Sequence, residues 1–198
     1  MKRMILASGS PRRKELLQML EAPFEVLVSD TKEVITKNEP AEVTKELSYQ
    51  KAMAVAGQVE EGIIIGADTV VSIDGKILGK PADTEEAREM IYKLQGKSHM
   101  VYTGVTVIAK SGDMVSASSF AEGTKVNVAP MTENEIEAYI STDEPYDKAG
   151  AYGIQGLFGK FIEGIKGDYF NVVGLPIHRL YEDCLLYTSD AADDKARV

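Results

Sequence analysis

The chain opens with a short apolar run that leads, through a loop of a few residues, into the start of a helix. Residues 4–7 are apolar and predict a buried strand. Ser10 is a favourable N-cap and Pro11 suits the first helical position. Apolar residues at helical spacing then extend the predicted helix over residues 11–20. This start indicates a fold in which strands connect directly to helices.

Two arginines occupy the first turn of that predicted helix. The positive end of a helix favours anions by roughly 0.3–1 kcal/mol per charge, so Arg12 and Arg13 are electrostatically unfavourable there. Residues that go against such local preferences often belong to functional sites. The hydroxyls of Ser8 and Ser10 and the free backbone N–H groups lie beside them. Together these groups predict a site for a polyanion. The alternative is a solvated pair of arginines on a surface helix.

Helices and strands alternate along the rest of the chain, and two predicted hairpins add antiparallel pairs. The further predicted helices cover residues 40–56, 84–94, 133–140 and about 175–183. The further predicted strands cover residues 24–28, 63–65, 70–73, 76–78, 98–109, 114–128 and about 160–165. The pattern favours an α/β fold with a mixed, twisted sheet flanked by helices.

The composition excludes several classes of protein. A net charge of −9 makes the chain a poor candidate for non-specific binding to duplex nucleic acid, although a locally basic pocket can still hold a small polyanion. Cys184 is the single cysteine, and His99 and His178 lie far apart, so neither a disulfide within the chain nor a zinc-type cluster is predicted. With no signal peptide pattern and no apolar stretch of membrane-spanning length, the cytoplasm is the expected compartment.

Asp68 is a candidate for acid–base chemistry. It follows the apolar run 63–65, in a segment that predicts a carboxylate at the end of a buried strand, where ligands gather in α/β sheets. Such a carboxylate can accept a proton from water or hold a metal ion. Taken alone, an aspartate that bonds the backbone of a turn is the simpler explanation.

Two lysines and a glutamate are further charged candidates. Lys51 lies close to the apolar face of the predicted helix 40–56, and Lys80 stands at the rigid exit of a hairpin, where it can direct a compact charge at phosphate oxygens. Glu33 lies in an acidic loop, and one or two carboxylates plus substrate phosphates suffice for Mg²⁺ or Mn²⁺. For each of the three, a solvated surface side chain is the alternative.

A glycine-rich loop over residues 142–159 carries an amide side chain, Gln155. An amide offers both a donor and an acceptor, which suits recognition of a nucleobase edge. The loop alone is a weak signal, because it matches neither the P-loop nor the dinucleotide-binding pattern.

As an ordered set, these motifs resemble the Maf family of nucleoside triphosphate pyrophosphatases. The motifs are Ser-Gly-Ser-Pro-Arg-Arg (8–13), Gly-Ala-Asp-Thr (66–69), Gly-Lys-Pro (79–81) and Asp-Lys-Ala-Gly-Ala-Tyr-Gly-Ile-Gln-Gly (147–156). The resemblance covers nearly all of residues 3–183. It implies an α/β fold related to inosine triphosphate pyrophosphatases, with two lobes around a cleft in one domain over residues 1–183, and a homodimer.

The resemblance also implies a reaction, the cleavage of a nucleoside triphosphate to its monophosphate and pyrophosphate. Asp68 matches the family's proton acceptor, and Glu33 matches a carboxylate associated with metal and water. The matching phosphate-binding positions are Arg13, Lys51 and Lys80. We therefore expect Asp68, Glu33 and Lys80 to be catalytic. We also expect a divalent ion, Mg²⁺, Mn²⁺ or Co²⁺, on Glu33 and Asp68.

The positions that match those linked to substrate choice are Arg12, Thr69 and Gln155. They carry the residues of the branch that acts on dTTP and UTP, whereas the branch acting on 7-methyl-GTP has tryptophan in place of the first arginine. The resemblance therefore implies a small-molecule pyrimidine triphosphate as substrate. The family is also linked to inhibition of septum formation.

Two other classes of function remain open. One is a nucleotide-binding regulator of cell division whose hydrolysis is incidental, which would bind a triphosphate tightly without releasing pyrophosphate. The other is a nucleotidyltransferase, which would form product only when an acceptor is supplied.

The last residues differ in character from the rest of the chain. From about Cys184 onward the helical periodicity breaks, and the segment resembles a translated sequencing adapter. We expect residues 184–198 to be a non-native or disordered tail. A genuine frayed terminus is the alternative.

Overall fold

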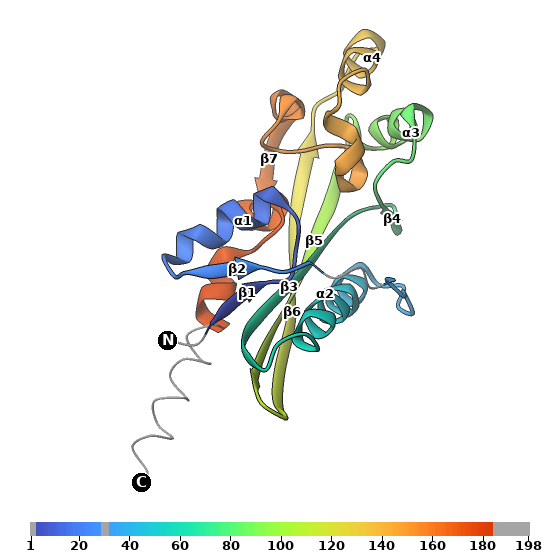
Figure 1. The fold of residues 1–198 in the computed structure, drawn as a ribbon. Coiled ribbons are helices and arrows are strands. Elements are labelled where there is room, and N and C mark those ends of the chain that lie inside the picture. The colour runs from blue at the N-terminus through green and yellow to red at the C-terminus, as the bar shows by residue number, and fades with distance from the viewer. Residues whose placement is uncertain (1–2, 29–31, 184–198) are drawn as a thin grey trace.

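The computed structural model describes residues 3–28 and 32–183, arranged around one mixed sheet (Figure 1). The predicted tail over residues 184–198, which includes Cys184, lies outside the described residues. None of the helices in the described part is long and apolar enough to cross a membrane.

The sheet has seven strands in the order β2-β1-β3-β5-β6-β7, with β4 paired to β3. The strands are β1 (Met4–Leu6), β2 (Phe24–Val26), β3 (Glu61–Ile73), β4 (Lys76–Leu78), β5 (Ser98–Ser111), β6 (Met114–Val128) and β7 (Ile162–Lys166). β1 runs parallel to β2 and β3, and the other pairs are antiparallel. The predicted mixed sheet with two hairpins is confirmed.

Most predicted helices are present with small changes at their ends. The α-helices are α1 (Pro11–Leu17), α2 (Pro40–Ala56), α3 (Thr84–Leu94), α4 (Glu133–Ile140) and α5 (Tyr169–Val173). The prediction of one helix over 11–20 was too long, since a 3₁₀ turn, η1 (Gln18–Leu20), ends it. The short α5 was missed, and residues 177–183 form the last described helix. The loop over 142–159 holds 3₁₀ turns η2 (Glu144–Asp147), η3 (Ala149–Ala151) and the start of η4 (Leu157–Phe161).

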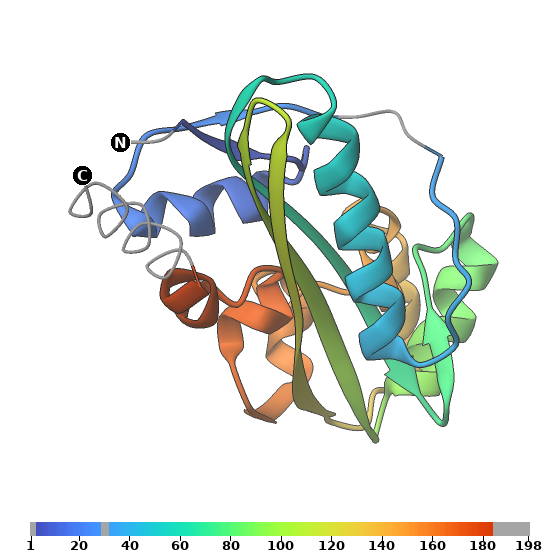
Figure 2. The same ribbon diagram turned by 90° about the horizontal axis from the view of Figure 1, so that it is seen from below.

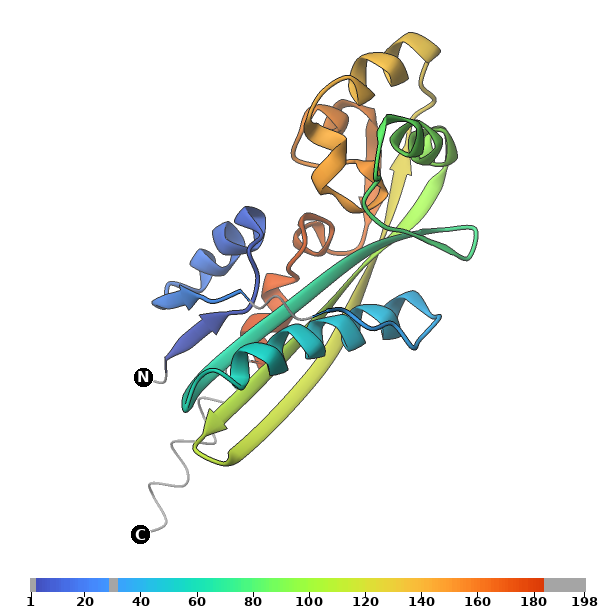
Figure 3. The same ribbon diagram turned by 45° about the vertical axis from the view of Figure 1, so that its right-hand side comes forward.

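Helices cover both faces of the long strands (Figures 2 and 3). α2 crosses one face of β3 and β5, and it lies very close to both strands. A Cβ atom at Gly66 would lie 2.3 Å from the carbonyl oxygen of Ser48, and one at Gly104 would lie 2.3 Å from the carbonyl carbon of Thr44. The two glycines therefore set the distance between helix and sheet. α1, α5 and the helix over 177–183 cover the opposite face.

The buried residues form cores at the two ends of the long strands, as expected for two lobes. One core gathers α3, α4 and β4 around residues such as Ile91 and Phe158. A second gathers α1, β1 and the chain after α5 around residues such as Leu17 and Leu175. A smaller one lies under α2. Because β3, β5 and β6 pass from one lobe to the other, the lobes share one sheet.

The predicted interruption of β3 was wrong. β3 is continuous, and residues 66–69 pair with β5 without a break, so Asp68 stands in the middle of a strand and not at its end. The strands beside β3 do end near Asp68. β1 pairs with β3 only as far as Ile65, and β4 pairs with β3 only from Val71 onward. Between these two pairings one edge of β3 has no strand partner in the described part of the chain.

Candidate active site

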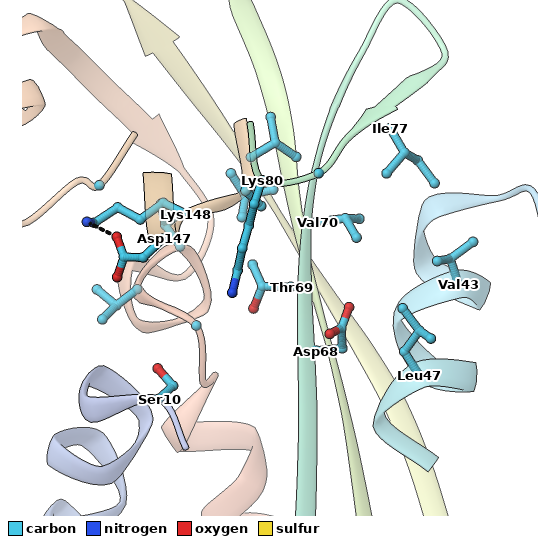
Figure 4. A pocket seen from close by; sticks show the side chains of 18 of the residues that line it. Ser10, Val43, Leu47, Asp68, Thr69, Val70, Ile77, Lys80, Asp147 and Lys148 are labelled. Carbon is cyan, nitrogen blue, oxygen red and sulfur yellow. Dashed lines mark hydrogen bonds and ion pairs between the residues drawn. The ribbon is translucent and has the colours of Figure 1, made fainter. Parts of the chain in front are cut away.

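A cavity of about 830 Å³ lies at this unpaired edge of β3 (Figure 4). Successive side chains on a strand point to opposite faces, so Asp68 faces α2 while Thr69 faces α1 and α5. The cavity reaches both faces around the edge. The sequence-predicted residues that line it are Ser10, Arg12, Arg13, Glu33, Lys51, Asp68, Thr69, Lys80 and Gln155. Ser8 lies behind them, and its hydroxyl accepts a hydrogen bond from Arg13.

Arg13, Thr69 and Gly174 line one side of the cavity, and Ser8 lies behind them in contact with Arg13; we call these four residues the α5 wall. The guanidinium of Arg13 donates from Nε to the carbonyl of Gly174 at 2.9 Å, from Nη1 to Ser8 Oγ at 3.2 Å and from Nη2 to Thr69 Oγ1 at 3.0 Å. All three acceptors are neutral. Burial lowers the pKa of Arg13 below its ordinary value, yet a guanidinium stays protonated in proteins. Its charge is therefore held in place without being cancelled by a bonded carboxylate.

The long side chain of Arg13 explains how the residue tolerates the first turn of α1. The charge leaves the helix end and reaches β3 and the chain after α5. Ser10 occupies the N-cap position as predicted, but its side chain makes no capping hydrogen bond with the described residues. The local sequence predicted the helix start correctly, and the tertiary contacts decide where the charge lies.

The other side consists of Glu33, Lys51 and Asp68, which we call the α2 wall. Lys51 extends from α2, and its Nζ lies 2.5 Å from Asp68 Oδ1 and 3.0 Å from Glu33 Oε1. The Asp68 side chain is 13% exposed, whereas that of Glu33 is 46% exposed. One ammonium therefore stands between a sheltered carboxylate and a solvated one, and the wall is negative overall.

The α2 wall fits the donor set of a hard divalent cation. Glu33 and Asp68 each place one carboxylate oxygen on the Lys51 ammonium, so the two carboxylates lie close to each other. One or two carboxylates plus substrate phosphates are the usual ligands of Mg²⁺ in phosphate-processing sites. Residues 3–28 and 32–183 contain no group of three or more His, Cys, Asp or Glu side chains arranged for a metal. The pair therefore suits an ion that also takes oxygens from the substrate.

Further charged groups lie at the mouth of the cavity. Arg12 donates to Asp147 Oδ2 at 3.1 Å, and Lys148 lies 2.5 Å from Asp147 Oδ1. The contact between Arg12 and Asp147 joins α1 to the turn η2 of the other lobe. Lys80 extends from the exit of β4 into the cavity toward Thr69 (Figure 4). Gln155, from the glycine-rich loop, lines the same space.

Comparison with known proteins places the chain in a family. The model of the family described as Maf-like protein matches residues 3–185. The chain belongs to the Maf family. It is 51% identical over 193 residues to the dTTP/UTP pyrophosphatase of Bacillus cytotoxicus, covering 97% of this chain and 99% of that protein. It is 47% identical over 191 residues to the dTTP/UTP pyrophosphatase of Bacillus cereus, covering 96% and 98%.

Among solved structures, the Ham1 protein of Staphylococcus aureus is 16% identical to this Maf-family chain. The superposition has a TM-score of 0.46 and covers 65% of this chain and 72% of that one.

The structure adds cavity residues that the sequence reasoning on this Maf-family chain did not single out. The carbonyl of Gly174 anchors Arg13, and Asp147, which lies in a motif used for the resemblance, anchors Arg12. An apolar patch also lines the cavity beside Asp68, made of Val43, Leu47, Val70 and Ile77 (Figure 4). The helical spacing of α2 contained a signal for this patch, because Val43, Leu47 and Lys51 share one helix face.

Tyr152, which also lines the cavity, is held from behind by a buried histidine. His99 Nε2 and the Tyr152 hydroxyl lie 2.6 Å apart, and the rings meet edge to face. Burial lowers the pKa of His99 to about 4, so the imidazole is neutral at physiological pH. Tyr152 is therefore held in the lining of the cavity by a hydrogen bond between two uncharged groups.

Proposed function

We propose that this chain hydrolyses nucleoside triphosphates, dTTP and UTP among them, to the nucleoside monophosphate and pyrophosphate. The observation that carries the proposal is that Arg13, Lys80 and Asp68 line one and the same cavity. Its size suits a nucleotide, since ligand pockets measure roughly 300–1,000 Å³. The printed names of the relatives support the same reaction and the same substrates.

In this proposal the cations bind the triphosphate. Arg13 keeps N–H donors beyond the three that Ser8, Thr69 and Gly174 accept, and these remain for phosphate oxygens. Lys80 adds a mobile point charge, and the Ser10 hydroxyl adds a short-range donor. Lys51 stands next to Asp68, so it serves the phosphate group nearest the attacking water.

Asp68 acts as the base. Lys51 bonds Oδ1, while Oδ2 has no hydrogen-bond partner among the described residues and can accept the proton of a water molecule. The water oxygen forms a bond to the α-phosphorus as the bond from that phosphorus to the bridging oxygen breaks. Pyrophosphate leaves with the bridging oxygen. No covalent enzyme intermediate is needed.

Glu33 and Asp68 are the residues that would hold a divalent ion, Mg²⁺, Mn²⁺ or Co²⁺. When bound, such an ion supplies positive charge to the phosphate oxygens. Glu33 is the more exposed of the two carboxylates, so it can adjust to the ion while Asp68 stays fixed on β3.

Substrate choice is assigned to Arg12, Thr69 and Gln155. Gln155 and Thr69 hold the pyrimidine edge or the sugar, and Arg12 shapes the entrance, where Asp147 already fixes its direction. A site that hydrogen-bonds a base rejects bases that leave its polar groups unpaired. We include a homodimer and the cytoplasm in the proposal, as the resemblance and the sequence implied.

The test is a screen of the purified protein against canonical and modified nucleoside triphosphates with Mg²⁺, Mn²⁺ or Co²⁺, with products identified by mass. We expect pyrophosphate and a monophosphate from dTTP and UTP. Release of orthophosphate would mean a cut at another bond. Tight binding without pyrophosphate release would favour a nucleotide-binding regulator, and product formed only with an added acceptor would favour a nucleotidyltransferase.

A further inference from the structure

Behind the α5 wall, a chain of buried hydrogen bonds runs from Arg13 away from the cavity. Arg13 donates to Thr69 Oγ1 at 3.0 Å, and Thr69 Oγ1 lies 2.9 Å from Thr103 Oγ1 on the neighbouring strand β5. Thr103 Oγ1 lies 2.9 Å from the backbone carbonyl of Asn171 in α5. Thr103 and Asn171 are fully buried, so Thr103 takes no part in lining the cavity.

The direction of this chain follows from its last link. A backbone carbonyl has no proton, so the single hydroxyl proton of Thr103 must point to the carbonyl of Asn171. Thr103 can then only accept from Thr69. The single hydroxyl proton of Thr69 is therefore directed at Thr103, away from the cavity.

The far end of the chain is itself fixed. The side-chain amide of Asn171 donates to the carbonyl of Val101 at 3.0 Å and to Thr124 Oγ1 at 2.9 Å. Thr124 in turn donates to the carbonyl of Asp168 at 2.9 Å. α5 is thus held against β5 and β6 by buried polar groups, and the position of the Asn171 carbonyl does not depend on a surface side chain.

We propose that Thr103 is a positioning residue that sets the hydrogen-bond polarity of Thr69, so that Thr69 offers the cavity a lone pair and no proton. A hydroxyl has one proton and two lone pairs. Thr103 takes the proton and Arg13 takes one lone pair, which leaves one lone pair. Thr69 cannot donate to a phosphate oxygen, but it can accept from an N–H group of the substrate.

This polarity matches the chemistry of one class of pyrimidine. This match rests on the proposed function, in which Thr69 meets the base. Uracil and thymine carry an N–H at ring position 3, whereas cytosine carries a lone pair there. We place Thr69 opposite ring position 3 of the base, where its lone pair accepts from uracil or thymine and opposes the lone pair of cytosine. Removing the Thr103 hydroxyl frees the Thr69 proton to turn toward the cavity.

The test compares kcat/KM for UTP and CTP in the wild-type protein and in variants of Thr103. We expect the wild type to favour UTP by about tenfold or more, the value of one good hydrogen bond in a buried site. Thr103→Val, which removes the hydroxyl and keeps the shape, should bring the UTP-to-CTP ratio close to one by a relative gain on CTP. Thr103→Ser keeps the hydroxyl and should keep the ratio.

Thr106→Val is the matched control. Thr106 is also fully buried on β5 and bonds the hydroxyls of Ser48 and Ser119, on the opposite side of the strand from Thr103. Its loss should lower stability and leave the ratio unchanged. General damage to the fold lowers activity on both substrates together, so only a change of polarity at Thr69 moves the ratio. Thr103→Ala is measured as well as Thr103→Val. If one of the two variants fails to fold, the other still tests the loss of the hydroxyl.

Several results would overturn the inference. A wild-type ratio near one would do so without any variant, and so would an unchanged ratio in Thr103→Val or Thr103→Ala. A ratio that falls equally in Thr103→Ser or Thr106→Val would assign the effect to packing. If the wild type releases pyrophosphate from no triphosphate at all, the proposed function fails first. If it cleaves UTP and the variants keep its ratio, only the role of Thr103 fails.

Discussion

The two walls of the cavity hold their charged groups by different means. In the α2 wall, one ammonium is bonded to two carboxylates, so charge is balanced against charge. In the α5 wall, one guanidinium is bonded to two hydroxyls and a backbone carbonyl, all neutral. The first arrangement leaves a net negative charge suited to a proton or a metal ion. The second leaves a full positive charge suited to a polyphosphate.

The comparison shows that a cation can be fixed without being neutralised. A carboxylate partner would hold Arg13 more strongly, but it would compete with the substrate for the same N–H donors. Neutral acceptors fix the direction of the guanidinium and leave more of its electrostatic attraction available for an anion. A hydrogen bond between two uncharged groups, His99 and Tyr152, also supports the lining of the cavity, whereas the α2 wall depends on side chains that are partly solvated.

The largest effect should follow from Asp68→Asn in the α2 wall. The amide cannot accept the proton of water, so turnover of dTTP or UTP should fall by about 10²–10⁴-fold while nucleotide binding remains. Pyrophosphate release and calorimetric binding measure the two quantities. Asp74→Asn, the same change in an exposed turn, should have no effect. Near-normal turnover in a folded Asp68→Asn protein would remove Asp68 from the role of base.

The next effect should follow from Arg13→Lys in the α5 wall. A lysine carries its donors on one atom and cannot reach three separated acceptors and a phosphate together. We expect kcat/KM to fall by about 10²-fold. Arg12→Lys is the matched variant, since Arg12 meets one exposed carboxylate, and its effect should be smaller. Equal losses in both variants would contradict the distinct role of the neutral acceptors.

A smaller effect concerns pH and the neutral bond of His99. The folded pKa is about 4 and the unfolded value is 6.5, so the unfolded chain binds more protons between them. Stability is therefore complete above the unfolded value and falls as the pH drops toward 4. From this residue we expect a loss of about 2 kcal/mol in the free energy of unfolding between pH 7 and pH 5.

Urea unfolding at the two pH values measures that loss. In His99→Gln the difference between pH 7 and pH 5 should shrink by the same amount, and in His178→Gln, at an exposed position, it should not. An equal pH dependence in wild type and His99→Gln would show that the imidazole is not held neutral by burial.

The smallest effect should follow from Glu33→Gln in the α2 wall. Because Glu33 is about half exposed, its pair with Lys51 contributes little, and stability should change by less than about 0.5 kcal/mol. Metal affinity should change more, with the half-saturating concentration of Mn²⁺ rising about tenfold in the presence of a non-hydrolysable UTP analogue. Electron paramagnetic resonance of free Mn²⁺ measures this directly. Glu39→Gln is the control, and an unchanged affinity in Glu33→Gln would leave Asp68 as the sole carboxylate ligand.

The sequence predicted those parts of the site that depend on neighbours along the chain. The helix start at Pro11 and the position of Lys51 on the inner side of α2 are local patterns, and the structure contains both. The resemblance brought together residues from distant segments, and the structure places them around one cavity. Their roles in binding and catalysis stay predictions.

The sequence did not predict the position of Asp68 within β3. Gly66 favours a turn when only local propensity is considered. In the structure it pairs with Thr106, and its missing side chain makes room for α2. Long-range pairing outweighed local propensity here, as it often does in sheets. The site therefore lies at an unpaired strand edge, and not at the end of a strand as the sequence predicted.

The sequence by itself determined most of the strands and helices, the cationic first turn of α1 and the charged residues available for catalysis, because periodicity and capping act over a few residues. Only the tertiary structure decided that Arg13 is held by neutral acceptors and Lys51 by carboxylates. Apart from Ser8, these partners lie between 17 and 161 residues away along the chain. Hydrogen bonds depend on distance and direction in space, which the spacing of residues along a chain does not encode.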